Sequence, residues 1–180
     1  MQSIQLTRRR FLAGLGTLAV AGALPGKALA STGHQRALSF LNLHTGERAS
    51  GTYWQAGAYQ QEVLDGFNQV LKCHRSGEVT NMDKGLFDQL SQLTQTLGYQ
   101  GEIQIISGYR SPAANAAMKK AGRNVATRSF HTLGRAIDVR LPGMNLAKVH
   151  KAALAMKAGG VGYYPGDNFI HLDTGRVRRW

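Results

Sequence analysis

Cysteine is nearly absent from this sequence, which contains one cysteine, Cys73, among 180 residues. A single cysteine excludes an intramolecular disulfide, and it excludes zinc or iron–sulfur sites that are built from several cysteines.

Acidic residues and long apolar runs are also scarce. Ten acidic residues stand against 22 basic ones, which gives a formal net charge of +12 at pH 7. No apolar run reaches the roughly 18–20 residues that a membrane-spanning helix needs. The hydrophobic fraction of 43% is ordinary for a folded chain, so the composition excludes general disorder and predicts a single basic domain.

The first thirty residues differ in character from the rest. A polar start contains Thr7-Arg8-Arg9-Arg10-Phe11-Leu12, an apolar stretch with three glycines follows, and Ala28-Leu29-Ala30 comes last. This order is typical of a cleavable signal peptide. The twin arginines followed by x-Phe-Leu resemble the twin-arginine (Tat) signal, which directs folded proteins across the bacterial inner membrane. An uncleaved anchor is the alternative, but about fourteen apolar residues are few for one. We therefore expect residues 1–30 to be a twin-arginine signal peptide that leaves no stable membrane anchor, and residues 31–180 to be a periplasmic domain.

The domain that remains after cleavage is still basic. The signal segment holds four of the basic residues and no acidic ones, which leaves 18 basic and 10 acidic residues and a net charge of +8. In the cytoplasm such a charge would favour nucleic acid as a partner, but the export signal argues against nucleic acid. The basic residues are dispersed, so the charge indicates a bias toward anionic polymers of the cell wall or lipid surfaces and not a binding motif.

Apolar periodicity predicts four helices and four strands in this domain. The helices are expected at residues 60–71, at 84–97 between an Asp83 cap and Gly98, from Ser111-Pro112 onward, and from an Asn145 cap to about Ala158. The strands are expected at residues 37–43, 102–107, 135–140 and 169–174. Strands and helices do not alternate regularly, so the sequence predicts an α+β fold.

Three polar side chains lie in or beside the predicted apolar strands. His131 precedes the strand that contains Asp138, and His171 lies in the last strand, where alternation places it on the same face as Asp173. A carboxylate buried among apolar neighbours is costly unless it is paired or binds a metal. Two imidazoles and one carboxylate form a typical zinc ligand set that leaves the fourth tetrahedral position open. Together, though not singly, His131, Asp138 and His171 predict a metal site.

At these residues the sequence resembles a known family. The pattern Ser-x-His-x-x-Gly-x-Ala-x-Asp, from Ser129 to Asp138, is similar to the signature of the M15 zinc peptidases, the group of the D-Ala-D-Ala carboxypeptidases, where it is paired with a distal histidine, here His171. Ser107-Gly108-Tyr109-Arg110-Ser111 resembles a further segment of that group. The DUF882 branch is more similar still, along almost the whole chain: in the twin-arginine signal, residues 43–47, 85–90, 159–165 and 169–175, and the terminal Trp180.

The resemblance implies a fold, a cofactor and a set of site residues. The fold is a small antiparallel sheet with flanking helices, as in the D-Ala-D-Ala carboxypeptidases and the hedgehog N-terminal domain. The resemblance also implies Zn²⁺ on His131, Asp138 and His171, with Arg110 facing the substrate carbonyl or carboxylate. A guanidinium there would stabilise the oxyanion that develops during amide attack; a solvated loop arginine is the alternative for Arg110.

The sequence departs from the family pattern at one position. Several branches have a catalytic Glu or Asp three residues before the last ligand, where this chain has Asn168, which cannot act as a base. Asp173 is the substitute that we expect, either as general base or as the partner that orients His171. Asp167, in a Pro-Gly-Asp turn, is the weaker candidate.

These features predict a periplasmic zinc metallopeptidase, a murein endopeptidase or carboxypeptidase whose partners are the stem peptides of peptidoglycan. The bond that is cut stays open between D-Ala–diaminopimelate, diaminopimelate–diaminopimelate and a terminal D-Ala, and so does the oligomeric state. The alternative is a non-catalytic cell-wall binding module with a structural zinc, which the missing carboxylate at Asn168 favours.

Overall fold

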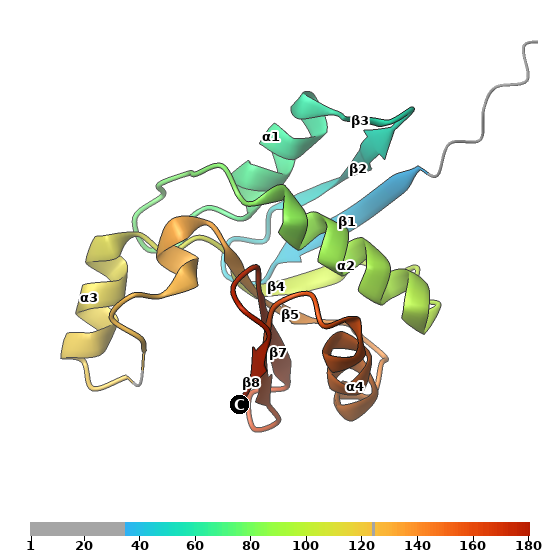
Figure 1. Cartoon of the computed structure of the whole chain (residues 1–180). Coiled ribbons are helices and arrows are strands. Elements are labelled where there is room, and N and C mark those ends of the chain that lie inside the picture. Colours follow the sequence, from blue (N-terminus) through green and yellow to red (C-terminus); the bar gives the residue numbers. More distant parts are fainter. Residues whose placement is uncertain (1–34, 124) are drawn as a thin grey trace, which may run out of the picture. The chain divides into compact units, whose positions relative to one another are not determined.

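The computed structural model describes residues 35–123 and 125–180, and the predicted signal peptide lies outside these residues. Figure 1 shows a sheet with helices packed around it. Within the described ranges, no helix combines the length and apolar character needed to cross a membrane.

The fold is α+β, as the sequence predicts, and each of the eight predicted elements is present. The helices of the described residues are α1 (Gln61–Val70), α2 (Lys84–Leu97), α3 (Pro112–Lys120), the 3-10 helix η1 (Phe130–Leu133) and α4 (Leu146–Met156). The strands are β1 (Arg36–Asn42), β2 (Arg48–Gln55), β3 (Ala58–Tyr59), β4 (Ile103–Ser107), β5 (Ala136–Arg140), β6 (Gly160–Tyr164), β7 (Phe169–Asp173) and β8 (Arg178–Arg179). Helix α4 ends two residues before the predicted end.

The sheet is larger than the sequence predicts. Its eight strands lie in the order β3-β2-β1-β4-β5-β7-β6-β8, and pairing is antiparallel except between β1 and β4 and between β6 and β8. Four strands, β2, β3, β6 and β8, were not predicted. Strands β3 and β8 have two residues each, β2 is mostly polar or small, and β6 carries two glycines, which are unfavourable in strands. These strands form because a neighbour supplies their hydrogen bonds, and a local pattern does not reveal that neighbour.

One hydrophobic core joins the helices to the sheet. Phe40 of β1 meets Phe67 of α1 with ring centroids 4.8 Å apart, and Phe67 meets Phe87 of α2 at 5.4 Å. Helix α1 packs on β1 and β2, helix α2 packs on β1 and α4, and helix α4 packs on β6 and β7. The core therefore extends along the sheet under α1, α2 and α4.

The face of the sheet opposite the core carries predicted metal ligands. In the β5–β7–β6 ladder, one row of paired residues belongs to the core: Ile137, Leu172 and Val161. Side chains alternate along each strand, so the adjacent row projects from the opposite face: Asp138, His171 and Gly162. Two of the predicted metal ligands, Asp138 and His171, thus share a row and a face.

The helix boundaries follow from local capping. The Asp83 carboxylate accepts the Gly85 N–H at 2.9 Å at the start of α2, and Gly98, at φ 63°, ends it in the left-handed region. Ser111 and Asn145 cap α3 and α4 in the same way. These are the caps that the sequence predicts.

We expect Leu90→Ala to lower the free energy of unfolding by about 2–5 kcal/mol, because Leu90 on α2 is fully buried and truncation leaves a cavity. Urea unfolding followed by circular dichroism measures this change. Leu133→Ala is the matched control: Leu133 is 60% exposed, so its effect should stay within about 0.5 kcal/mol. Equal effects of the two variants would contradict the assignment of the core.

Candidate metal centre

His131, Asp138 and His171 come from three elements: η1, β5 and β7. The Ser129 hydroxyl accepts the His131 N–H at 3.3 Å and caps η1, and Gly134, at φ 66°, ends it. This single turn reverses the chain just before β5, which places His131 beside the row that holds Asp138 and His171. The Ser129–Asp138 pattern therefore spans the turn η1 and the first residues of β5.

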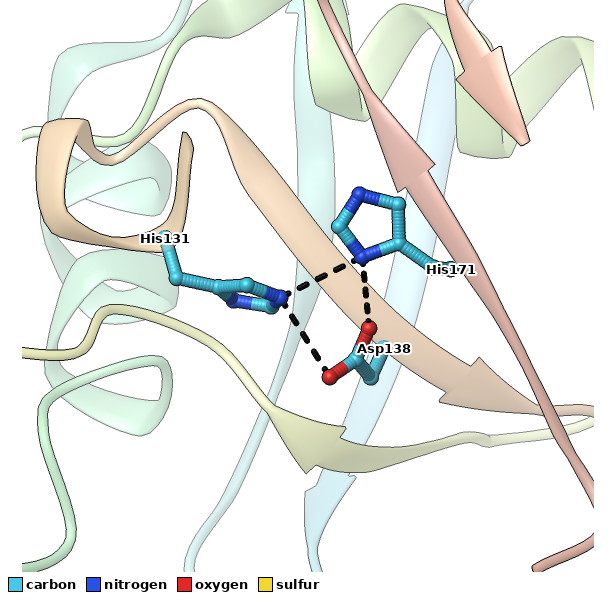
Figure 2. Close-up of side chains that lie close together, drawn as sticks. All are labelled: His131, Asp138 and His171. Carbon is cyan, nitrogen blue, oxygen red and sulfur yellow. Dashed lines mark hydrogen bonds and ion pairs between the residues drawn. The ribbon is translucent and has the colours of Figure 1, made fainter. Parts of the chain in front are cut away.

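The three side chains converge on one point (Figure 2). His131 Nε2 lies 3.3 Å from His171 Nδ1 and 3.3 Å from Asp138 Oδ2, and His171 Nδ1 lies 2.8 Å from Asp138 Oδ1. Ligand atoms bound about 2.0–2.1 Å from a tetrahedral ion lie about 3.3–3.4 Å from one another. The separation of the two nitrogens and that of His131 Nε2 from Asp138 Oδ2 match this geometry, and the second oxygen of Asp138 lies closer to His171 Nδ1.

The hydrogen bonds outside the cluster assign the tautomers of both histidines. His131 Nδ1 lies 2.8 Å from the Gly108 carbonyl oxygen, and His171 Nε2 lies 3.0 Å from Asp173 Oδ2. Both partners accept hydrogen bonds, so in a neutral imidazole these nitrogens carry the proton. The lone pairs of His131 Nε2 and His171 Nδ1 then face each other and the Asp138 carboxylate. A cation satisfies such a meeting of electron-rich atoms, so the donor set fits a divalent metal.

The cluster is buried, and its charges compensate one another. Each of the three residues is at most 8% exposed. Burial alone would raise the pKa of Asp138, but His131 and His171 hold that pKa well below its usual range. Burial likewise opposes protonation of His171, and the two aspartates at its ring nitrogens raise its pKa above the ordinary value. The two aspartates therefore favour positive charge at the centre of the cluster.

Asp173 is fully buried behind His171 and has no free carboxylate oxygen. Besides His171, its oxygens accept the Gly160 and Gly175 N–H groups at 3.1 and 2.8 Å and a bidentate pair from Arg178. Burial opposes the charged form, but His171, Arg178 and the Gly175 N–H keep its pKa well below the usual range. Of the two roles expected for Asp173, this geometry matches the one that orients His171.

Arg178 reaches Asp173 across β6 because Gly160 stands between them. Gly160 pairs with Asp173 on one side and with Arg178 on the other. A Cβ at Gly160 would lie 2.5 Å from Asp173 Oδ2 and still closer to the Arg178 guanidinium. Sequence reasoning missed Arg178; the glycines of residues 159–162 were the available sign that side chains meet across that strand.

Arg110 lies beside the cluster, half-buried. Its backbone N–H donates to the His131 carbonyl at 3.1 Å, and its guanidinium donates to Ser107 and Asn115 at 3.4 and 3.3 Å. Ser107 is in turn the β4 partner of Asp138. Burial lowers the pKa of Arg110, and the negative charge of Asp138 opposes that shift. The guanidinium is therefore held near the cluster by the end of β4 and the first turn of α3.

Asp167 and Asn168 lie in the exposed turn between β6 and β7. Their backbone carbonyls accept hydrogen bonds from Arg140 at 3.0 and 2.8 Å, and Asn168 has a positive φ of 54°. Among the described residues, the histidine and acidic side chains that converge closely enough to hold a metal are His131, Asp138 and His171. Asp167 is not one of them.

Two histidines without an expected role lie together on the surface. The rings of His44 and His74 stack with centroids 4.0 Å apart, and His44 Nε2 lies 3.1 Å from the Ile106 carbonyl oxygen. His150 stacks on Tyr163. None of the three belongs to the metal cluster.

The family of this chain follows from comparison with known proteins. Residues 30–180 match the peptidase M15 family described as "Peptidoglycan L,D-endopeptidase MepK". The chain belongs to this M15 peptidase family. The match covers the whole described structure, so the fold and the metal cluster both lie within the family's domain.

Curated relatives of this M15 peptidase match it from end to end. Peptidoglycan L,D-endopeptidase MepK of Escherichia coli strain K12 and that of Shigella flexneri are each 42% identical over 183 residues, which is all of both chains. The probable peptidoglycan L,D-endopeptidase MepK of Haemophilus influenzae is 40% identical over 184 residues, all of this chain and 98% of its own. Among solved structures, none matches the chain significantly.

We expect Asp173→Asn to weaken binding of a divalent metal ion about 10–100-fold, because the amide no longer provides the charge that orients His171 and holds its proton. Competition with a chromophoric chelator measures the affinity, and circular dichroism verifies the fold. Asp167→Asn, in the exposed turn, is the matched control and should leave affinity unchanged. An unchanged affinity in a folded Asp173→Asn variant would show that Asp173 does not act through His171.

Proposed function

We propose that this protein is a periplasmic, zinc-dependent murein endopeptidase that hydrolyses amide bonds in the stem-peptide cross-links of peptidoglycan. The observation that carries the proposal is the convergence of two imidazole lone pairs and one carboxylate in His131, Asp138 and His171. The full-length similarity to peptidoglycan L,D-endopeptidases supports the substrate class.

His131 Nε2, His171 Nδ1 and the Asp138 carboxylate would hold the zinc. When bound, zinc would lower the pKa of a coordinated water to about 7 and polarise the substrate carbonyl. Gly108 and Asp173 keep the two histidines in the ligating tautomer, and Arg178 keeps Asp173 ionised and in place. Asp173 is thus a positioning residue, since its oxygens have no room for a substrate proton.

Arg110 would stabilise the negative charge that develops on the scissile carbonyl oxygen. Its guanidinium is half-buried beside Asp138, and contacts with Ser107 and Asn115 fix its position before substrate arrives. A preorganised cation in a partly dry site is worth more than one in water, because it needs no reorganisation as charge develops.

The stereochemistry in the relatives' name favours one of the possible bonds. A diaminopimelate–diaminopimelate cross-link joins an L-centre to a D-centre, whereas a D-Ala–diaminopimelate cross-link joins two D-centres. The relatives are named L,D-endopeptidases. We therefore propose the diaminopimelate–diaminopimelate amide as the substrate bond.

Export by the twin-arginine pathway fits this substrate, because peptidoglycan lies outside the inner membrane. The Thr7–Leu12 motif and the Ala28-Leu29-Ala30 exit support this route. The net charge of +8 on residues 31–180 suits the anionic cell wall.

Incubating the exported, zinc-loaded protein with muropeptide dimers should release monomers, and mass spectrometry of the products identifies the bond. Each of His131→Ala, Asp138→Ala and His171→Ala should abolish release, because two ligands cannot hold the metal tightly. His150→Ala, which alters a histidine outside the cluster, should leave activity intact. Binding of dimers without any release would instead establish the cell-wall binding module that the Asn168 position favours.

Arg110→Ala should lower kcat about 10²–10³-fold, since removing one group that stabilises an oxyanion has an effect of that size. Steady-state kinetics on a cross-linked muropeptide measures the loss, and Zn²⁺ affinity should stay as in the wild type. Arg48→Ala, on β2 at the far side of the sheet, is the control. A kcat within twofold of wild type would contradict this role and support the alternative, a solvated loop arginine.

A further inference from the structure

The C-terminal residue, Trp180, packs against a metal ligand. Its indole and the His171 imidazole have ring centroids 5.1 Å apart, with planes inclined by 52°. Although Trp180 is far from the Ser129–Asp138 pattern in the sequence, the pairing of β8 with β6 brings it to the same face of the sheet. The last residue of the chain therefore borders the metal centre.

Gly162 makes this contact possible. It lies opposite His171 in the β6–β7 ladder, and a Cβ there would come within 2.8 Å of the indole. The indole of Trp180 thus covers Gly162 and reaches His171 on β7. In the same way, Arg178 covers Gly160 and reaches Asp173. Two glycines in one strand let two side chains of the C-terminal segment meet the metal centre, one behind His171 and one beside it.

The indole is fixed in its position before any ligand arrives. Its Nε1–H donates to the Tyr164 hydroxyl at 2.8 Å, and the Arg178 guanidinium lies 4.9 Å from its ring. The Trp180 N–H donates to the Val161 carbonyl at 3.3 Å, and its carbonyl accepts the Tyr163 N–H at 3.1 Å. An aromatic ring held this firmly offers a contact surface at low entropic cost.

Trp180 is nevertheless partly open to solvent. Trp180 is 50% exposed, and it is the aromatic member of the exposed large hydrophobic residues in the described chain, beside Leu43, Val79, Leu133 and Val177. Trp180 therefore offers an exposed aromatic side chain next to His171.

We propose that Trp180 is a substrate-binding residue whose exposed face packs on the stem-peptide residue next to the scissile amide. The inference rests on the proposed endopeptidase function and adds to it a contact for the aliphatic side chain of that residue. The indole supplies apolar area and a π-face, and the methylene chain of a diaminopimelate supplies the complementary surface.

Distance favours the peptide over the sugar as the occupant. An extended chain advances about 3.3 Å per residue, so a glycan attached two or more residues from the scissile bond lies roughly 7 Å or more along the stem. The indole contacts a metal ligand directly, which places it beside the residues that flank the cleaved bond.

Kinetics on a sugar-free cross-linked stem-peptide dimer tests the proposal. We expect Trp180→Ala to raise KM about tenfold or more, in line with an aromatic contact of ordinary strength, with kcat within about threefold and Zn²⁺ affinity unchanged. Trp180→Phe should recover most of the loss. Trp54→Phe is the matched control, because Trp54 lies on β2 at the other end of the sheet and packs on Tyr59.

Fluorescence gives a second measurement that does not need turnover. The chain has two tryptophans, so the Trp54→Phe variant reports on Trp180 alone. Titration with the uncross-linked, sugar-free stem tetrapeptide should shift or quench its emission in a saturable manner. The Trp180→Phe variant, which keeps Trp54, should show no change.

The failure of this proposal differs from the failure of the proposed function. A wild-type protein that cleaves no dimer overturns the function. A wild-type protein that cleaves dimers while Trp180→Ala leaves KM unchanged overturns only the role of Trp180. Loss of Zn²⁺ binding in Trp180→Ala, or a KM effect confined to substrates that carry the disaccharide, overturns it as well.

Discussion

His171 lies between two aspartates, and the proposed metal centre depends on this arrangement. Asp173 faces one ring nitrogen and Asp138 faces the other. Because Asp173 is buried and held ionised by Arg178 and backbone N–H groups, it fixes the proton on the far nitrogen and directs the remaining lone pair toward Asp138 and His131. Asp173 thereby does for His171 what the Gly108 carbonyl does for His131.

The two faces of the sheet have different roles: one packs into the hydrophobic core, and the other carries the site residues. One face of β5, β7 and β6 packs into the core that α1, α2 and α4 cover, and the other carries the ligand row and its supports. Glycines at positions 160 and 162 leave that second face open across β6, so that Arg178 and Trp180 reach the ligand strand. Strand β6 thereby joins the C-terminal segment to the ligand strand β7.

Much of the fold could be predicted from local patterns. The four helices with the Asp83, Ser111 and Asn145 caps were predicted because periodicity and capping are properties of neighbouring residues. The strands β2, β3, β6 and β8 were not predicted, since short, polar or glycine-rich segments become strands only when a partner strand completes their hydrogen bonds. The predicted sheet was therefore too small.

The sequence by itself determined which residues can bind a metal, because His131, Asp138 and His171 are the types that zinc prefers and a buried carboxylate needs a partner. Only the tertiary structure decided how they act. It pairs Asp138 with His171 in neighbouring strands and gives each histidine a hydrogen-bond acceptor that orients it. It also buries Asp173, whose carboxylate is paired with Arg178. It also brought the C-terminal Trp180 to the ligand strand. Such roles depend on contacts between residues distant in the chain, and no local pattern of residues encodes those contacts.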